Sequence, residues 1–341
     1  MSLDQLTPDE HQQIILAMKA EQTVVVKGVA GSGKSLTLLK KAKQVSSFSN
    51  SYTIIVYTKS LKQFFIDELK EIGQSEGHVY YYWEWEHSSK PYVDYMFVDE
   101  CQDFNAEEIA DFSEHGKYCW FFGDTNQSIM TFEPTDLSSG HTVQSVEETA
   151  KQLGVHPQSL GINHRLTVEN AKVGEYINPN SRLSLACYRH GPKPFLINSD
   201  KQLEEIIQIF QNRGFTDIGI LAYFNSHVEI IKNIFSERGI PVEWKTKDCM
   251  TIDFKSTNPK IITFHCAKGL QFDNVFVPFC ECYQEDKKSA LYVACTRPLS
   301  QLFLLYNFQQ CTLLPPNSSD IYNKPIEVQQ GIDDQKQTEL F

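Results

Sequence analysis

Apolar residues in the first third of the chain fall into two patterns that alternate along the sequence. Short runs of β-branched or aromatic residues predict buried strands, and stretches with apolar residues at helical spacing predict amphipathic helices. The expected strands lie at residues 23–29, 52–58, 93–100 and 118–124, and the expected helices at 35–45, 61–72 and 106–115. This alternation is typical of a parallel sheet covered by helices on both faces.

The same alternation returns in the second half of the chain. Expected strands lie at residues 193–199, 217–224, 240–246, 260–266, 274–279 and 300–307, and expected helices at 202–214 and 228–239. A chain of 341 residues is long enough for two domains that each bury a core. We predict an α/β fold of two parallel-sheet domains, at residues 1–155 and 156–312, followed by a polar tail at 313–341.

Composition and charge narrow the classes of function. The formal net charge of -12 excludes a global positive field, so a nucleic-acid site would have to be a local groove that relies on stacking. The nine cysteines lack paired C-x-x-C spacing and favour reduced thiols over a zinc site. No apolar run approaches the roughly 20 residues of a membrane span, and the acidic, polar N-terminus is unlike a signal peptide. We therefore expect a cytoplasmic protein without membrane partners.

The segment "GVAGSGKS" follows the first expected strand and opens the first expected helix. Glycines in such a loop let backbone N–H groups wrap the phosphates of a nucleotide. A lysine then reaches the β and γ phosphates, and a hydroxyl can ligate magnesium. The candidate residues are Gly28, Ala30, Gly31, Ser32, Gly33, Lys34 and Ser35. The alternative is a plain glycine turn, but the strand before it and the helix after it favour the phosphate loop (P-loop).

Two further strand ends supply polar side chains. In "YMFVDECQD", Asp99 is placed to hold magnesium and Glu100 to polarise an attacking water. The alternative is a strand that ends in a solvated acidic turn, but adjacent carboxylates at a strand end are costly without a cation and favour the metal site. In "CWFFGDTNQSI", Gln127 is placed to sense a γ phosphate, and the alternative is a capped Asp and Asn turn.

The order of these segments resembles a known family. From about Leu6 to Tyr306 the chain is similar to superfamily-one helicases of the UvrD, Rep and PcrA type. The segments that carry this resemblance are residues 28–35, "DECQD", "GDTNQSIMTF", "LGINHRLT", "TFHCAKGLQFDNVFV" and "LYVACTRP". The resemblance implies two RecA-like P-loop domains, with ATP and Mg²⁺ in the cleft between them.

Two arginines of the second domain would complete the active site. In these helicases the second domain sends two arginines to the γ phosphate, and Arg165 of "NHR" and Arg297 of "ACTR" match those positions. Guanidinium groups neutralise the charge that develops in phosphoryl transfer, and their origin in the other domain makes hydrolysis depend on domain closure. Without the resemblance, both would be interpreted as surface arginines.

The resemblance also implies contacts with single-stranded DNA. Thr263 and His265 of "TFHC" match positions that face DNA, and Phe132 matches an aromatic residue that stacks on a base. Tyr57 and Thr58 are a looser match to a further DNA contact. Taken alone, Phe132 fits a core position equally well.

Recognition of the nucleotide base departs from the family pattern. The family reads adenine with a Gln in an N-terminal helix, and the sequence offers Gln12 and Gln13 without deciding between them. His164 stands where the family has a stacking Tyr. Gly269 matches a position near the nucleotide, and Gln271 stands where the family usually has Glu. We expect ATP use with weaker base selectivity than is usual.

The spacing of the motifs and the last residues add two expectations. Relatives that unwind duplexes carry large inserted domains where this chain has only residues 61–96 and 166–262, so it resembles the two-domain motor alone. Gln337, Leu340 and Phe341 resemble the Q-x-x-L-F peptide that docks on the bacterial sliding clamp. A plain disordered terminus would give the same five letters by chance.

Three functions follow from the sequence. The first is a DNA helicase or translocase core, which is a DNA-dependent ATPase that moves on single-stranded DNA or at a fork. It would act as a monomer or as a subunit of a complex. The second is an ATPase switch subunit of a repair, replication or defence complex without unwinding of its own. The third, a small-molecule kinase, does not need Arg165 and Arg297 in a second domain.

Overall fold

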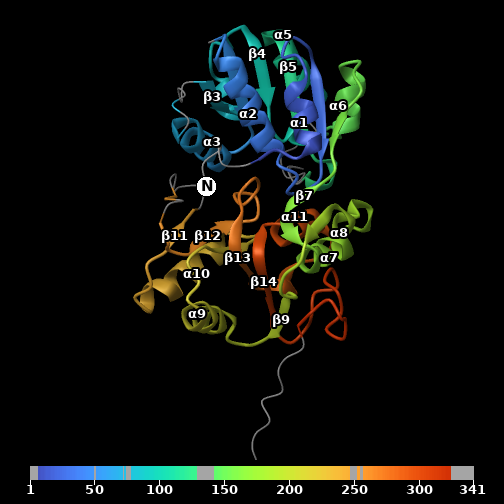
Figure 1. The fold of residues 1–341 in the computed structure, drawn as a ribbon. Coiled ribbons are helices and arrows are strands. Elements are labelled where there is room, and N and C mark those ends of the chain that lie inside the picture. The colour runs from blue at the N-terminus through green and yellow to red at the C-terminus, as the bar shows by residue number, and fades with distance from the viewer. Residues whose placement is uncertain are drawn as a thin grey trace, which may run out of the picture.

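A computed structural model describes residues 7–49, 51–71, 73, 78–128, 142–245, 252–253 and 256–323. In this part of the chain two six-stranded sheets, each entirely parallel, are stacked one above the other in Figure 1. The α/β fold with two parallel-sheet domains, expected from the alternating pattern, is confirmed.

The first sheet has the strand order β3-β2-β4-β5-β1-β6. Its strands are β1 (Val24–Gly28), β2 (Tyr52–Val56), β3 (Val79–Tyr81), β4 (Val93–Val98), β5 (Gly116–Gly123) and β6 (Gln158–Leu160). Its helices are α1 (Glu10–Ala17), α2 (Lys34–Ser46), α3 (Lys59–Glu71), α4 (Tyr82–Glu86), α5 (Ala106–His115) and α6 (Val146–Gln152). Separate apolar clusters bury α1 to α3 on one face and α4 to α6 on the other.

The second sheet has the strand order β11-β12-β10-β13-β14-β9. Its strands are β9 (Phe195–Asn198), β10 (Ile218–Ala222), β11 (Glu243–Trp244), β12 (Lys260–Thr263), β13 (Phe272–Val277) and β14 (Pro298–Tyr306). Its helices are α7 (Val168–Ile177), α8 (Leu183–Ala186), α9 (Gln202–Arg213), α10 (Asn225–Glu237) and α11 (Lys288–Cys295). A short parallel pair, β7 (Asn163–Thr167) and β8 (Cys187–Arg189), follows the crossing from the first sheet.

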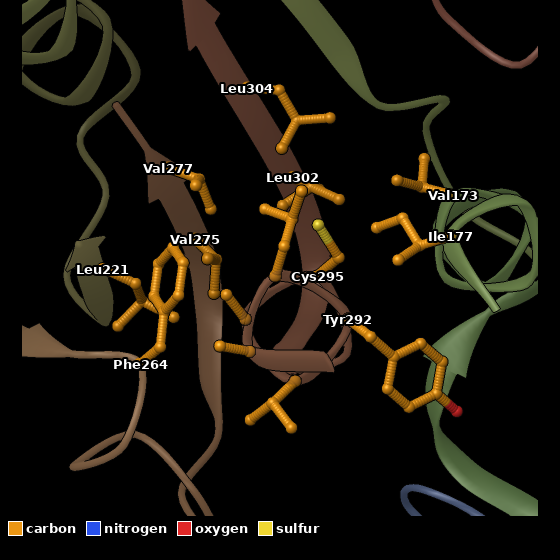
Figure 2. Close-up of a cluster of buried hydrophobic side chains, with 14 of the residues drawn as sticks. Val173, Ile177, Leu221, Phe264, Val275, Val277, Tyr292, Cys295, Leu302 and Leu304 are labelled. Carbon is orange, nitrogen blue, oxygen red and sulfur yellow. The ribbon is translucent and has the colours of Figure 1, made fainter. Parts of the chain in front are cut away.

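The helices of the second sheet also divide between its two faces. Helices α9 and α10 pack with one face, and α7 and α11 with the other. Figure 2 shows side chains of α7 facing Leu302 and Leu304 of β14, with Cys295 of α11 between them. The amphipathic spacing of these helices therefore buries both sides of the sheet, as the near-continuous apolar strands require.

Two of the expected domain boundaries and one expected strand differ from the structure. Because β6 pairs with β1, the chain leaves the first sheet after Leu160 and not at residue 155. The expected tail at 313–341 begins too early, since Leu313, Leu314 and Tyr322 are buried in the core of the second domain. In the sequence these apolar residues are surrounded by Pro, Asn and Ser, so the composition of the segment predicts a polar tail. The strand expected at 240–246 is reduced to the two residues of β11.

The strand order determines where the functional residues meet. Strand β5 lies between β1 and β4, and all three run in the same direction. Their carboxyl ends therefore lie side by side at one edge of the first sheet, which brings the P-loop, Asp99 and Asp124 together. Among the described residues, no helix is both long and apolar enough to cross a bilayer.

Candidate active site

The P-loop joins β1 to α2 and is closely approached by two other segments. Gly31 and Gly33 have φ angles of 72° and 77°, in the backbone region that favours glycine. A Cβ atom at Gly31 would lie 2.6 Å from Oδ1 of Asn163, and one at Gly33 would lie 2.4 Å from Nε2 of Gln12. Both glycines are thus required by backbone conformation and by their neighbours.

The loop presents the features of a phosphate site. It ends at the N-terminus of α2, where backbone N–H groups and the helix dipole favour an anion. Lys34 is 6% exposed, and its Nζ donates to the carbonyl oxygens of Gly28 (2.9 Å) and Val29 (3.2 Å). Ala30 and Ser32 are buried, and the Ser32 hydroxyl has no hydrogen-bond partner among the described residues. A buried hydroxyl of this kind fits a ligand rich in oxygen.

Two buried carboxylates follow β4. Asp99 is 0% exposed and Glu100 4% exposed. The Ser35 hydroxyl donates to Oδ2 of Asp99 over 2.7 Å, and Nε2 of Gln102 donates to Oε2 of Glu100 over 2.6 Å. Glu100 has a φ of 54°, a strained conformation for a residue with a side chain. Backbone strain of this kind is concentrated at functional sites.

The environment separates the pKa values of the two carboxyl groups. Burial, reinforced by the neighbouring Glu100 charge, raises the pKa of Asp99 to about 7. Burial opposes ionisation of Glu100 as well, but the Lys268 and Lys34 cations bring its pKa below the usual value. Glu100 is therefore the carboxylate that stays ionised and can accept a proton from water.

Ser35 and Asp99 fit a magnesium ion. A hydroxyl and a carboxylate are oxygen ligands of the kind that Mg²⁺ takes, and they lie within hydrogen-bond distance of each other beside the P-loop. A cation at this point would also offset the cost of ionising Asp99 in a buried site. Held by Ser35 and Asp99, Mg²⁺ would supply positive charge to offset the negative charge of a bound phosphate group.

Asp99→Asn is expected to make the metal-free protein more stable at pH 8 relative to wild type. The pKa of Asp99 is about 7 in the folded protein against 3.8 as its ordinary value. The stability contributed by this group is therefore full below pH 3.8 and is lost as the pH rises to about 7. Urea unfolding with EDTA at pH 5 and pH 8 would show this loss in wild type and not in Asp99→Asn. Asp94→Asn, on the strand β4 that Asp99 follows, is the control. An identical pH dependence in Asp99→Asn and wild type would contradict the prediction.

Arg297 reaches the first domain from the second. It is 1% exposed, and its Nη2 donates to Oε1 of Gln127. Nε2 of Gln127 in turn donates to Oδ2 of Asp124 over 2.7 Å. Burial lowers the pKa of Arg297 to about 10, so the guanidinium remains charged at neutral pH. Gln127 thus lies between an arginine of the second domain and the end of β5.

Arg165 lies beside the P-loop with spare donor capacity. Its Cβ is the atom that a side chain at Gly31 would meet, and its Nη1 donates to the carbonyl of Thr296 over 3.3 Å. The Nε–H group is buried without a partner among the described residues. Burial, together with the nearby Arg297 charge, lowers the pKa of Arg165 to about 9. A charged group with unused donors next to a P-loop is suited to an anionic ligand.

Lys268 joins the two domains at the same site, and the sequence did not single it out. Its Nζ donates to Oδ2 of Asp103 (2.6 Å) and to the carbonyl of Gln127 (2.7 Å), and lies 3.8 Å from Oε2 of Glu100. The side chain is 2% exposed. Lys268 stands within "TFHCAKG", three residues after His265, and its place in this motif was the sequence signal that pointed to it, whereas its burial is visible only in the structure.

The N-terminal helix approaches the loop through Gln12 and not through Gln13. The Asp9 side chain accepts from the Gln12 backbone N–H as the cap of α1, and Nε2 of Gln12 donates to the carbonyl of Ser32 over 3.0 Å. Gln13 is exposed and donates to the carbonyl of Pro8. The structure therefore brings Gln12 to the P-loop.

His164 links α1 to the second domain. Its backbone N–H donates to the carbonyl of Gly31 over 2.9 Å. Its ring lies between the Asp9 carboxylate, at Nε2, and the Tyr188 hydroxyl, 3.2 Å from Nδ1. The histidine is thus fixed beside the P-loop by contacts at both ring nitrogens.

Gly269 and Gln271 do not join this cluster. Gly269 has a φ of 80°, and a Cβ there would lie 2.6 Å from Cδ1 of Leu61 on α3. It therefore serves the close packing of the second domain against the first. The side chain of Gln271 is exposed.

Comparison with known protein families agrees with this geometry. A family model described as the viral superfamily 1 RNA helicase core domain matches residues 24–208, and a model described as the UvrD-like helicase C-terminal domain matches residues 260–305. The chain belongs to the superfamily 1 helicases. Both matches cover segments of this helicase that contribute to the cluster around the P-loop. No curated protein sequence matches it.

Similar solved structures also come from helicases. An Arterivirus nonstructural protein 10 helicase is 17% identical over 92% of this chain and 66% of its own, with a TM-score of 0.49. The complex of that helicase with DNA is 17% identical over 90% and 65%, with a TM-score of 0.48. The C-terminal domain of a possible DNA helicase from Lactobacillus plantarum is 20% identical over 46% and 96%, with a TM-score of 0.38. This helicase spans about two thirds of the Arterivirus chains.

The residues expected to face DNA differ in exposure. Tyr57 is partly buried and stacks on Tyr82, with ring centroids 5.8 Å apart. The Thr58 hydroxyl accepts from the Leu61 backbone N–H at the start of α3. Phe132 lies outside the described residues of this helicase.

Thr263 and His265 lie at the carboxyl end of β12. Thr263 is 6% exposed, and its hydroxyl accepts from the Cys266 backbone N–H, so it shapes the turn that carries His265. His265 is partly exposed and lies against Tyr223. In this helicase the same loop continues to Lys268 beside Asp103 and Gln127, so His265 lies only three residues from the cluster around the P-loop.

Proposed function

We propose that this superfamily 1 helicase hydrolyses ATP between its two domains and uses their closure to move along single-stranded DNA. One observation carries the proposal: Arg165, Lys268 and Arg297 of the second domain all lie at the edge of the first sheet that bears the P-loop and the carboxylates. Three cations from another domain at a phosphate site make hydrolysis depend on how the domains are placed.

Each residue of the cluster has a proposed role in hydrolysis. The P-loop amides and Lys34 bind the phosphates, and Ser35 with Asp99 would hold Mg²⁺. Glu100, kept ionised by neighbouring lysines, orients the water and accepts its proton. Arg165 and Arg297 stabilise the charge that develops on the γ phosphate. Gln127 accepts from Arg297 and lies just after β5, so a change in its hydrogen bonds when the γ phosphate is present would affect both domains.

Base recognition is proposed for Gln12 and His164. The Gln12 side chain and the His164 backbone N–H each donate to a backbone carbonyl of the P-loop, so the two residues flank the phosphate site. Asp9 contacts both side chains and fixes their positions. We propose ATP as the nucleotide, with His164 contacting the adenine base at the position where the family has a stacking tyrosine.

The proposed binding path of the single strand is formed by Tyr57, Thr58, Phe132, Thr263 and His265. The similarity to UvrD, Rep and PcrA favours DNA, whereas the family model that matches most of the chain is described as an RNA helicase. One similar structure is described as a helicase complex with DNA. The choice between DNA and RNA is therefore a part of the test.

Steady-state ATP hydrolysis with and without single-stranded oligonucleotides tests the proposal. We expect oligo(dT) to stimulate the rate severalfold in low salt, oligo(rU) to do so less, and Lys34→Ala to be inactive in every condition. A Lys34-dependent rate that neither oligonucleotide changes would overturn the motor and favour the switch subunit, whose ATPase would respond to a protein partner. Stimulation by oligo(rU) alone would assign the motor to RNA.

The C-terminal residues carry a separate proposal. Gln337, Leu340 and Phe341 lie outside the described residues, and their pattern supports docking on a bacterial sliding clamp. Removal of residues 337–341 is expected to abolish binding to immobilised clamp while leaving ATP hydrolysis unchanged. Equal clamp binding by the truncated and the full chain would contradict it.

A further inference from the structure

Strand β7 does not pair regularly with its neighbour β8. Asn163 pairs with Cys187, and Thr167 pairs with Arg189, so four steps along β7 correspond to two steps along β8. Two extra residues of β7 therefore lie between the paired positions, where the ladder of hydrogen bonds is interrupted. Figure 1 shows β7 between the two sheets, where the chain enters the second domain. Irregular pairing of this kind next to an active site serves to aim a side chain.

The backbone N–H groups of this irregular segment are taken up by one side chain. Oδ1 of Asn163 accepts from the backbone N–H of Arg165 and from that of Leu166, over 2.8 Å in each case. Asn163 is 0% exposed, and its Nδ2 donates to the carbonyl oxygen of Ala30 in the P-loop. The side chain of Asn163 therefore connects the irregular segment to the phosphate site.

The carbonyl groups of the same segment accept from a second side chain, that of Arg189 in β8. Its Nη1 donates to the carbonyl oxygen of Arg165 over 2.6 Å and to that of His164 over 3.4 Å. A charged donor makes such hydrogen bonds stronger than those between neutral groups. In the part of the chain that the structure describes, no carboxylate pairs with Arg189. The guanidinium thus replaces the missing ladder contacts of β7.

Both backbone polar groups of Arg165 are held by these side chains. Asn163 accepts from its N–H group, and Arg189 donates to its carbonyl group. The two contacts fix the orientation of the peptide units on either side of Arg165, and with it the direction of the Cα–Cβ bond. This bond brings the side chain to the P-loop, because a Cβ atom at Gly31 would lie 2.6 Å from Cβ of Arg165. The hydrogen bond from Arg189 therefore bears on where the Arg165 guanidinium is presented.

We propose that Arg189 is a positioning residue for ATP hydrolysis, which holds the Arg165 backbone so that its guanidinium is aimed at the γ phosphate. The inference rests on the proposed function, because Arg189 acts through the role assigned to Arg165. A charge that is already in place stabilises the transition state without reorganisation. Displacement of such a group by about 1 Å can lower the rate by about 10²-fold. Arg189 is accordingly needed for kcat and not for binding of ATP, which the P-loop provides.

Steady-state ATP hydrolysis without oligonucleotide tests this role. We expect Arg189→Ala to lower kcat by about 10-fold to 100-fold and to change KM for ATP by about twofold or less. Arg213→Ala is the matched control and should keep the wild-type kcat, because Arg213 is an exposed arginine of the same domain that donates to Gln301 over 2.8 Å. A wild-type kcat in Arg189→Ala, with or without a raised KM, would overturn the proposal.

A double-mutant cycle separates positioning from a general loss of structure. In Arg165→Ala there is no guanidinium left to position, so the further change Arg189→Ala should alter kcat by about threefold or less. Equal losses of kcat from Arg189→Ala in the wild-type and Arg165→Ala backgrounds would overturn the positioning role and leave the role of Arg165 intact. A wild-type kcat in Arg165→Ala alone would overturn the proposed role of Arg165 and this inference together.

Two milder substitutions test the donor with less change in packing. Lysine at position 189 keeps a positive charge and a donor for the Arg165 carbonyl, whereas methionine keeps an unbranched side chain without a donor. We expect Arg189→Lys to recover part of the kcat that Arg189→Ala loses, and Arg189→Met to recover none. Melting temperatures measured in parallel should be similar for Arg189→Lys and Arg189→Met. Equal kcat values in these two variants would contradict the proposal.

Discussion

Replacing Arg165 by alanine is expected to lower kcat for ATP hydrolysis by about 10³-fold with little change in stability. The buried Nε–H of Arg165 has no partner among the described residues, and the one hydrogen bond that its side chain donates goes to a backbone carbonyl. Among the described residues, its removal therefore breaks no ion pair. What is lost is the positive charge beside the P-loop, which matters most when negative charge develops in the transition state.

The measurement is steady-state hydrolysis at saturating ATP, with the melting temperature determined in parallel. Arg165→Lys should recover only part of the rate, because an ammonium cannot form the planar two-donor contact of a guanidinium. Arg238→Ala, at an exposed arginine paired with Glu204, is the control. A higher KM with an unchanged kcat in Arg165→Ala would contradict the assigned role and indicate ground-state binding alone.

Lys268→Ala is expected to reduce the free energy of unfolding by about 3–5 kcal/mol. The substitution removes the cation that pairs with the buried Asp103 carboxylate and lies 3.8 Å from Oε2 of Glu100, and it removes a donor to the Gln127 carbonyl. An unpaired charge in a buried site is costly, whereas a pair replaced as a whole by apolar residues is often close to neutral. The double variant Lys268→Met with Asp103→Leu should therefore recover part of the stability lost in Lys268→Ala.

Urea unfolding followed by circular dichroism measures this difference. Lys62→Ala serves as the comparison, because Lys62 pairs with Glu84 at the surface over 2.6 Å and should change the free energy of unfolding by about 1 kcal/mol or less. Equal losses in Lys62→Ala and Lys268→Ala would show that burial of the Lys268 pair has no energetic consequence.

The parts of the site that depend on neighbouring residues in the sequence were predicted best. The P-loop and Asp99 each follow a buried strand directly, so the local apolar pattern predicts the strand that precedes each of them. Because the strands are parallel, their carboxyl ends are expected at the same edge of the sheet. The choice between Gln12 and Gln13 depended on where α1 begins. Asp9 caps that helix and turns Gln12 toward the loop, a detail that two adjacent glutamines do not reveal.

Features that depend on two distant segments were missed. Lys268 acquires its partners only when the second domain meets Asp103, across 165 positions of sequence. Leu313 and Leu314 fill a core that includes residues as far upstream as Leu166 and Ala171. The spacing of residues within a motif carries no information about contacts between segments that are far apart in the sequence.

The packing of the P-loop has a consequence for how the molecule melts. Ala30 belongs to the same buried apolar cluster as Leu166 and Phe264, and Val29 packs against it, so the loop of one domain is part of the core of the other. Loss of either core would expose the other, and calorimetry should show one cooperative endotherm in place of two. We therefore expect the two halves of this helicase to melt as a single thermodynamic unit, so that a destabilising change in one half lowers the melting temperature of both.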